Sequence, residues 1–215
     1  MKLYRYLFLF LLVSLVSVAC QTNGSALSTT GILSDTINGH EYVDLGLPSG
    51  VKWATCNVGA SSPSDYGDYY AWGETTPKSE YIEENCKTWK KSLGGISGNS
   101  QYDAARANWG GSWRLPSNTE CEELIKKCTW TWTSQGGYNG YKITGPNGNS
   151  IFVPAAGFRL GSSIYCAEDF GYYWSSTPYG SIAQRTSYYL GFFSSHHSVG
   201  WLNRNGGFSV RPVSD

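Results

Sequence analysis

Two adjacent histidines near the C-terminal end, His196 and His197, are candidates for metal binding or acid–base catalysis. They close the segment 186–197, which reads TSYYLGFFSSHH. Imidazole is a common metal ligand and a common acid or base. Neighbouring residues of an extended segment point to opposite sides, so His196 and His197 cannot chelate one metal together. His40 is the only other histidine, and no HExxH, GxSxG or triad pattern occurs. We therefore predict no catalytic residues, no metal site and no cofactor, and a protein that is not an enzyme.

Other reactive side chains have structural explanations. Asp65, Asp68 and Glu74 could gather a cation, but capping of loop N–H groups is the favoured interpretation. Arg114 and Arg211 are expected to make structural ion pairs or carbonyl contacts. The cysteines other than Cys20 are five, and none forms a CxxC pair. An odd number leaves at least one thiol unpaired, and the pattern supports neither zinc nor redox chemistry.

The strand before the histidines carries aromatic residues on both of its sides. Alternation places Tyr188, Leu190 and Phe192 on one side, which we expect to face the core. The other side and the segments around it are rich in Tyr, Ser, Gly and Asn, the residues that antibody loops use for recognition. We predict a recognition surface made of Tyr179, Ser181, Ile182, Arg185, Ser187, Tyr189, Gly191, Phe193, His196, His197, Gly200, Leu202, Asn203 and Asn205.

Short strands and few helices must position these residues. The segment YVDLGL, the turn PSG and the segment VKWATCNVG predict a hairpin. The best helix signal is LPSNTECEELIKKCTW, where Ser117 and Glu120 form a capping box and Cys121, Leu124, Ile125 and Cys128 form an apolar stripe. A second, short helix is expected around 103–107. Further short strands follow the helix, so the fold class is predicted to be α+β.

The N-terminal segment predicts where in the cell the protein is located. Lys2 and Arg5 precede an apolar run from Tyr6 to Val18, which predicts a signal peptide over 1–19. Ala19 and Cys20 resemble the end of a bacterial lipobox, so we predict lipidation of Cys20; simple secretion and an uncleaved anchor are the alternatives. The polar segment 20–40 is predicted to be a tether, with one domain over 41–215.

The amino-acid composition limits the kinds of partner that the protein is expected to bind. Charged residues are 15% of the chain, aromatic residues are also 15%, and the formal net charge is +0. Such a chain lacks the positive charge that nucleic-acid binding requires, so nucleic acid is excluded as a partner. The membrane is expected to be contacted through the lipid anchor only.

Six segments in the same order resemble the Fibrobacter succinogenes major paralogous domain family. They are EYVDLGLPSGVKWATCNVGA, DYGDYYAWGET, NWGGSWRLPSNTE, GPNGNSIFVPAAGFR, YYWSST and GGFSVRPV, and they span 41–213. The resemblance implies a C-type lectin-like fold in the variant of formylglycine-generating enzymes, in a secreted or lipid-anchored protein of Bacteroidota. The copper-binding cysteine pair of those enzymes and the calcium-dependent sugar motifs EPN, QPD and WND are missing here. Asp35-Thr36-Ile37 resembles the O-glycosylation signal of that phylum, with Thr36 as the acceptor.

Some family members resemble variable proteins of diversity-generating retroelements. That resemblance implies a constant frame of Tyr188, Leu190, Phe192, Val199 and Trp201 facing the core. It implies variable positions between them, at Ser187, Tyr189, Gly191, Phe193, His196, His197, Gly200 and Leu202. Adenine mutation of AAC or AAT codons cannot produce Lys, Glu, Gln, Met or Trp, and between 175 and 209 the chain contains no Lys, Glu or Met. Its single Gln184 and single Trp201 would have to be frame residues, and chance depletion in a chain with few charges is the alternative explanation.

Two hypotheses follow for the function. The first is a lipid-anchored ligand-binding or adhesion domain that binds an unknown protein or glycan. The second is a structural paralog of the cell envelope without a specific ligand. An enzyme acting on glycans ranks third, because no pair of catalytic carboxylates is visible. The expected location is the outer membrane, on either its periplasmic or its cell-surface face.

Overall fold

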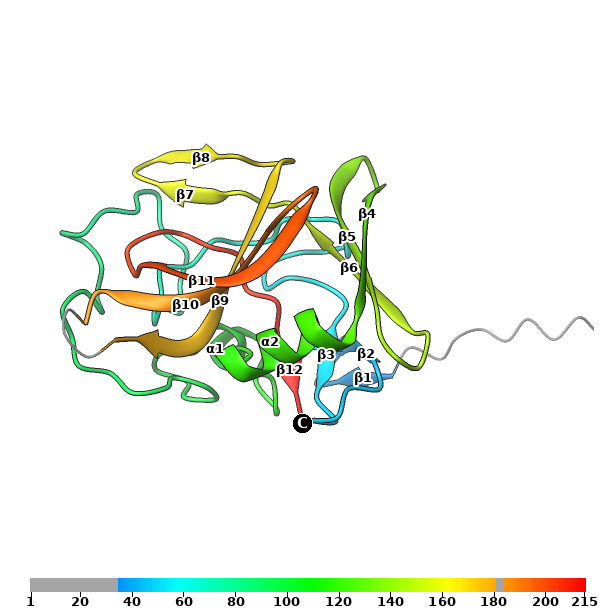
Figure 1. The fold of residues 1–215 in the computed structure, drawn as a ribbon. Coiled ribbons are helices and arrows are strands. Elements are labelled where there is room, and N and C mark those ends of the chain that lie inside the picture. The colour runs from blue at the N-terminus through cyan, green and yellow to red at the C-terminus, as the bar shows by residue number, and fades with distance from the viewer. Residues whose placement is uncertain (1–34, 181–183) are drawn as a thin grey trace, which may run out of the picture. The chain divides into compact units, whose positions relative to one another are not determined.

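A computed structural model describes residues 35–180 and 184–215, so the predicted signal peptide, Cys20 and most of the predicted tether lie outside the described residues. Within these residues 40% are in strands and 9% in two short helices, which agrees with the predicted α+β class (Figure 1). In the described part of the chain no helix is long and apolar enough to cross a membrane.

In the described ranges, twelve strands are distributed over four antiparallel sheets (Figure 1). One sheet has the order β1-β2-β3-β12, another the order β4-β5-β6, a third the order β11-β10-β9, and β7 pairs with β8 alone. The strands are β1 (Thr36–Ile37), β2 (His40–Asp44), β3 (Lys52–Ala54), β4 (Thr129–Gln135), β5 (Tyr138–Thr144), β6 (Ser150–Pro154), β7 (Phe158–Leu160), β8 (Ser163–Tyr165), β9 (Phe170–Tyr179), β10 (Thr186–Phe193), β11 (His196–Asn203) and β12 (Val213–Ser214).

The first sheet begins earlier than the sequence suggested. Thr36 pairs with Glu41 and Ile37 with His40, so residues 36–40, which the sequence analysis placed in the tether, belong to the folded unit. Thr36 itself is exposed on β1. The predicted hairpin is confirmed, since β2 and β3 pair from Tyr42 and Ala54 to Asp44 and Lys52.

Both predicted helices are present, and each begins at a side-chain cap. In α2 (Asn118–Lys127) the Ser117 hydroxyl accepts from the Glu120 N–H while the Glu120 carboxylate accepts from the Ser117 N–H, which satisfies donors that a helix leaves free at its first turn. The α1 helix (Ala104–Trp109) is capped by Asp103. The stripe of α2 is also as predicted: Cys121 and Leu124 are buried, and Ile125 and Cys128 pack against the same cluster.

Two large apolar clusters lie on the two sides of the β9–β11 sheet. The first joins α2 and the β4–β6 sheet to one side of β10 through Leu190 and Phe192. The second joins α1 to tryptophans from distant loops and to Phe208, and Tyr189 of β10 packs against it. The central strand therefore has core contacts on both sides.

Candidate functional site

The register of the β9–β11 sheet gathers aromatic residues on the side opposite α2. Phe193 of β10 lies between Phe170 of β9 and His196 of β11, and Gly191 lies between Tyr172 and Ser198. Because side chains alternate along a strand, these residues and Tyr189 share one face of the sheet. We call this set the aromatic face: Phe170, Tyr172, Tyr189, Gly191, Phe193, His196 and Ser198.

The rings of the aromatic face form a continuous series. Phe170 and Phe193 have centroids 5.3 Å apart, Phe170 and Tyr172 6.3 Å, and Tyr172 and Tyr189 5.3 Å. Phe193 continues the series to His196 at 5.6 Å. Such contacts restrict each ring, so the apolar surface is held in place before any ligand arrives.

Two glycines allow Tyr189 to lie across the sheet. A Cβ at Gly191 would stand 2.5 Å from Tyr189 Cε2, and one at Gly200 would stand 2.8 Å from the Tyr189 hydroxyl. Both distances are too short for a side chain. The space that remains above Gly191 is a pocket of about 140 Å³, which the aromatic face and Phe192 line.

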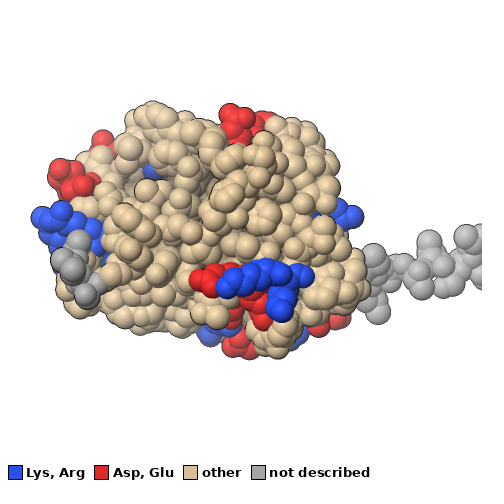
Figure 2. Space-filling view, in the orientation of Figure 1, with Lys and Arg blue, Asp and Glu red and all other residues tan. Residues whose placement is uncertain are grey.

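The aromatic face presents uncharged phenyl and phenol rings to a ligand. None of its residues is Lys, Arg, Asp or Glu, and burial raises the pKa of Tyr172 and of Tyr189 above the usual value, which keeps both phenols protonated. Figure 2 shows the charged groups of this view in a few patches, one of them over α2, beside broad uncharged surface. Rings with a few hydroxyl and imidazole groups can bind a ligand by stacking and hydrogen bonding.

The structure places some predicted site residues on this face and others away from it. Tyr189, Gly191, Phe193 and His196 line the pocket, and Gly200 supports it. Arg185, Leu202 and Asn203 are exposed at the other end of the sheet. Ser181 and Ile182 lie outside the described residues.

For three residues the predicted position on the recognition surface is wrong. Ser187 is fully buried, because the Arg204 guanidinium lies beneath the strand and its Nε donates to the Ser187 hydroxyl at 3.1 Å. Asn205 is 5% exposed, because it follows Arg204 into the interior. His197 belongs to the opposite side of the sheet, where its ring stacks on Trp130 at 4.5 Å.

Of the residues expected to face the core, Leu190, Phe192 and Val199 do so and Trp201 does not. Leu190 and Phe192 are buried, and Val199 packs against the first cluster. Trp201 is 52% exposed and stacks on Tyr179 with centroids 4.8 Å apart, because α2 does not extend over this end of β11 (Figure 1). Tyr179 is half-buried and forms an aromatic pair with the exposed Trp201 on the α2 side, away from the pocket. Tyr188, which meets Tyr179 edge-on, is half-buried.

Sequence reasoning missed Phe170, Tyr172 and Ser198. The signal for the first two was the alternation in FGYYW, which places Phe170, Tyr172 and Trp174 on one side of a strand. Their strand is distant from Phe193 in the chain, and only the pairing of β9 with β10 shows that they share a surface.

Three of the charged residues considered for chemistry, Asp65, Arg114 and Arg211, have structural partners. The Asp65 carboxylate accepts hydrogen bonds from the N–H groups of Ser61 and Ser62, as a loop cap does. Arg114 pairs with Glu120 and Asp215, and Arg211 donates to the carbonyls of Ala54 and Thr55. Among the described residues no three His, Cys, Asp or Glu side chains are close enough to hold a metal ion, and the five described cysteines are free thiols.

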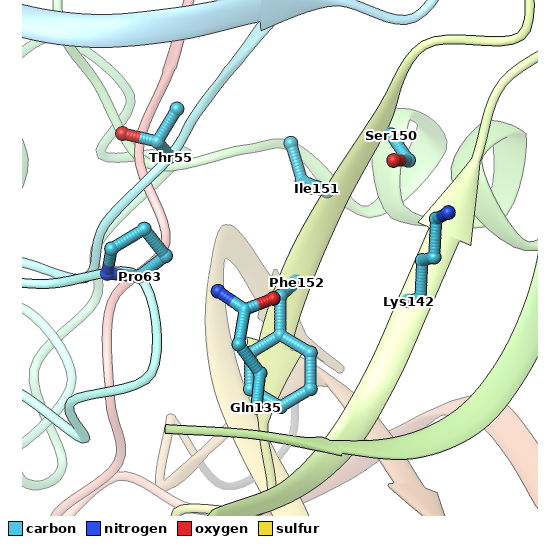
Figure 3. Close-up of a pocket in the computed structure, with 7 residues that line it drawn as sticks. All are labelled: Thr55, Pro63, Gln135, Lys142, Ser150, Ile151 and Phe152. Atoms are coloured by element: carbon cyan, nitrogen blue, oxygen red, sulfur yellow. The ribbon is translucent and has the colours of Figure 1, made fainter.

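A second pocket opens between the β4–β6 sheet and the loop after β3. It has a volume of about 340 Å³ and is lined by Thr55, Pro63, Gln135, Lys142, Ser150, Ile151 and Phe152 (Figure 3). The figure shows Thr55 and Pro63 facing side chains from β4, β5 and β6. Its only charged lining group is the Lys142 ammonium, and no predicted site residue contributes to it.

The position of His197 has a consequence for pH. Burial, together with the neighbouring His196, lowers the pKa of His197 below its ordinary value, so the folded protein binds this proton less readily than the unfolded chain. This contribution to stability is therefore complete above the unfolded pKa and is lost as pH falls through the folded pKa. We expect urea midpoints to fall less between about pH 7.5 and pH 5.5 in His197→Phe than in the wild type. Identical falls would show that His197 titrates normally.

Comparisons with protein-family models, with curated proteins and with solved structures each found no match.

Proposed function

We propose that the chain is a lipid-anchored, extracytoplasmic binding protein, without enzymatic activity, whose aromatic face recognises a protein or glycan ligand. The observation that carries this proposal is the ring-lined pocket above Gly191. Aromatic side chains that are held in place lose little entropy on binding and supply large contact area. Four of the residues expected from the sequence to contact ligand, Tyr189, Gly191, Phe193 and His196, line that pocket.

The proposal includes the C-type lectin-like fold of the resembling family. The segments that carry the resemblance contribute fully buried side chains: Trp72 from AWGE, Trp113 from SWRLP and Arg211 from SVRPV. Residues that fill a core specify a fold more strongly than surface residues do. Their burial supports the resemblance at the level of architecture.

Diversification by a retroelement is part of the same proposal, with a reduced set of positions. Changes at Tyr189, Phe193 or His196 would alter the pocket while Leu190 and Phe192 keep the opposite side packed. Ser187 does not suit variation, because its hydroxyl accepts from the buried Arg204.

The test is binding by the full-length protein to arrayed oligosaccharides and arrayed peptides. We expect at least one probe to bind the wild type and to bind Phe193→Ala and Phe170→Ala more than about tenfold more weakly, since truncation of a central aromatic commonly costs 2 kcal/mol or more. Ile164→Ala is the matched control, because Ile164 is 50% exposed on β8 and does not line the pocket.

Two outcomes would contradict the proposal. A probe that binds the wild type and both phenylalanine variants equally would place recognition elsewhere. If the wild type binds no probe of either array, the alternative of a structural envelope protein without a specific ligand is favoured.

A further inference from the structure

A pocket beside α1 shares no residue with the aromatic face. It has a volume of about 420 Å³, within the range of small-molecule sites. We call it the α1 pocket; its lining is His40, Val58, Gly59, Ala60, Ser61, Asp68, Tyr70, Asn108 and Trp109.

Asp68 supplies the charged group of the α1 pocket. Its Oδ2 receives one long hydrogen bond, from the Tyr70 hydroxyl at 3.5 Å, and it forms no ion pair within the described chain. Asp65 of the same loop differs, because its carboxylate is filled by three donors from Ser61 and Ser62. Most of the acceptor capacity of Asp68 is therefore open to a ligand.

The loop holds this carboxylate in place. The Asp68 N–H donates to the Val58 carbonyl at 2.9 Å, and the Asp68 carboxylate lies directly against Gly59. A Cβ at Gly59 would overlap Oδ2, and φ at this glycine is +80°, a region that other residues rarely adopt. Because Gly59 has no side chain, the Asp68 carboxylate can lie against its backbone in the wall of the α1 pocket.

The other walls add an acceptor and a neutral ring. Asn108 Nδ2 donates to the carbonyls of Thr75 and Ala104, which fixes the amide and leaves its oxygen without a donor in the described chain. The His40 ring stacks on Trp109 with centroids 3.8 Å apart, and burial lowers the pKa of His40, so its imidazole is neutral at pH 7. No Lys or Arg lines the pocket.

The chemistry of these walls selects among ligands. A neutral ligand that covers Asp68 would remove water from a carboxylate without neutralising it, which is costly. An anion would add repulsion. An ammonium group has three donors and no acceptor, which matches the open carboxylate and the open amide oxygen, and the neighbouring rings favour a cation.

We propose that the α1 pocket binds a protonated primary amine, such as the side chain of a lysine residue or an amino sugar. This inference does not depend on the aromatic face. The two named sources share the ammonium group, and the experiment separates them.

The experiment follows the imidazole resonances of His40 in the full-length protein, which has three histidines. The probes are Nα-acetyl-lysine amide and glucosamine, each compared with its uncharged counterpart, Nα-acetyl-norleucine amide or glucose. We expect a saturable shift of the His40 signals with one ammonium probe at millimolar concentration, and none with its counterpart. The probe that binds identifies the source as peptide or amino sugar.

Asp68→Asn keeps the shape of the side chain and removes its charge. We expect it to weaken binding about tenfold or more, as for a hydrogen bond to a charged group. Asp65→Asn and Phe193→Ala should leave the affinity unchanged, and the second variant separates this site from the aromatic face. If Asp68→Asn does not fold, rising salt on the wild type is the substitute, because it should weaken binding of an ammonium ion.

Several results would overturn the inference. They are equal shifts with charged and uncharged probes, no shift with either ammonium probe, a response to Ca²⁺ in place of the amines, and unchanged affinity in a folded Asp68→Asn protein or at high salt.

Discussion

Phe192→Ala is expected to lower the free energy of unfolding by about 3–5 kcal/mol, and Phe193→Ala by much less. The two rings are adjacent on β10 but lie on opposite sides of the sheet. Phe192 is 3% exposed and lies 5.8 Å from the ring of Tyr173 and 5.4 Å from that of Tyr141. It also covers Gly171, where a Cβ would overlap the ring. Truncation would leave a cavity that these rigid neighbours cannot fill.

The adjacent pair provides its own control. Phe193 is half-buried and contacts Phe170 and His196, so its loss removes part of a surface and creates no closed cavity. Urea unfolding at one pH, followed by tryptophan fluorescence, measures both variants. Equal losses would show that β10 is buried to the same extent on its two sides, and the proposal of an open aromatic face would fail.

The elements that the sequence predicted well depend on local signals. Ser117 and Glu120 satisfy each other within one turn, and the apolar stripe of α2 has the period of a helix, so helix and orientation follow from adjacent residues. The β2–β3 hairpin and the division of β10 into two sides have the same origin. Leu190 and Phe192 were assigned correctly because alternation is a property of the strand itself.

The wrong predictions concern which residues of other segments cover each side of the β9–β11 sheet. Ser187 was expected at the surface, but Arg204 reaches it from the loop after β11. Trp201 was expected in the core, but α2 leaves that end of the sheet uncovered. Strand pairing also shifts register between Ser187 and Tyr189, which no pattern within β10 indicates. These contacts depend on the packing of distant segments.

The pocket of the aromatic face and the α1 pocket both depend on the pairing or packing of distant segments. The ring series of the aromatic face needs β9 beside β10, and the α1 pocket needs α1 beside the loop that carries Asp68. In the sequence, Asp65 and Asp68 are equivalent loop carboxylates. The structure separates them, because donors fill the first and leave the second open.

Asp103 is the buried carboxylate whose replacement should cost most. Its Oδ1 accepts from the N–H groups of Ala105 and Arg106, the first turn of α1, at 2.9 and 3.1 Å. Its Oδ2 accepts from the N–H groups of Gly98 and Leu115 at 2.7 and 2.9 Å. The side chain is completely buried. One residue therefore caps a helix and ties it to two other segments.

Asp103→Asn is expected to lower the free energy of unfolding by about 2–4 kcal/mol, because an amide can accept at only one of its two ends. The NH₂ group would face the Gly98 and Leu115 N–H groups and leave two buried donors unpaired. The loss is partly offset, because burial raises the pKa of Asp103 and a neutral amide avoids the cost of a buried charge. Asp65→Asn is the matched control: its three bonds all end on Oδ2, so an amide oxygen can replace it at a cost of about 1 kcal/mol or less. Chemical unfolding of both variants decides the matter, and equal losses would show that the second oxygen of Asp103 contributes nothing to the fold.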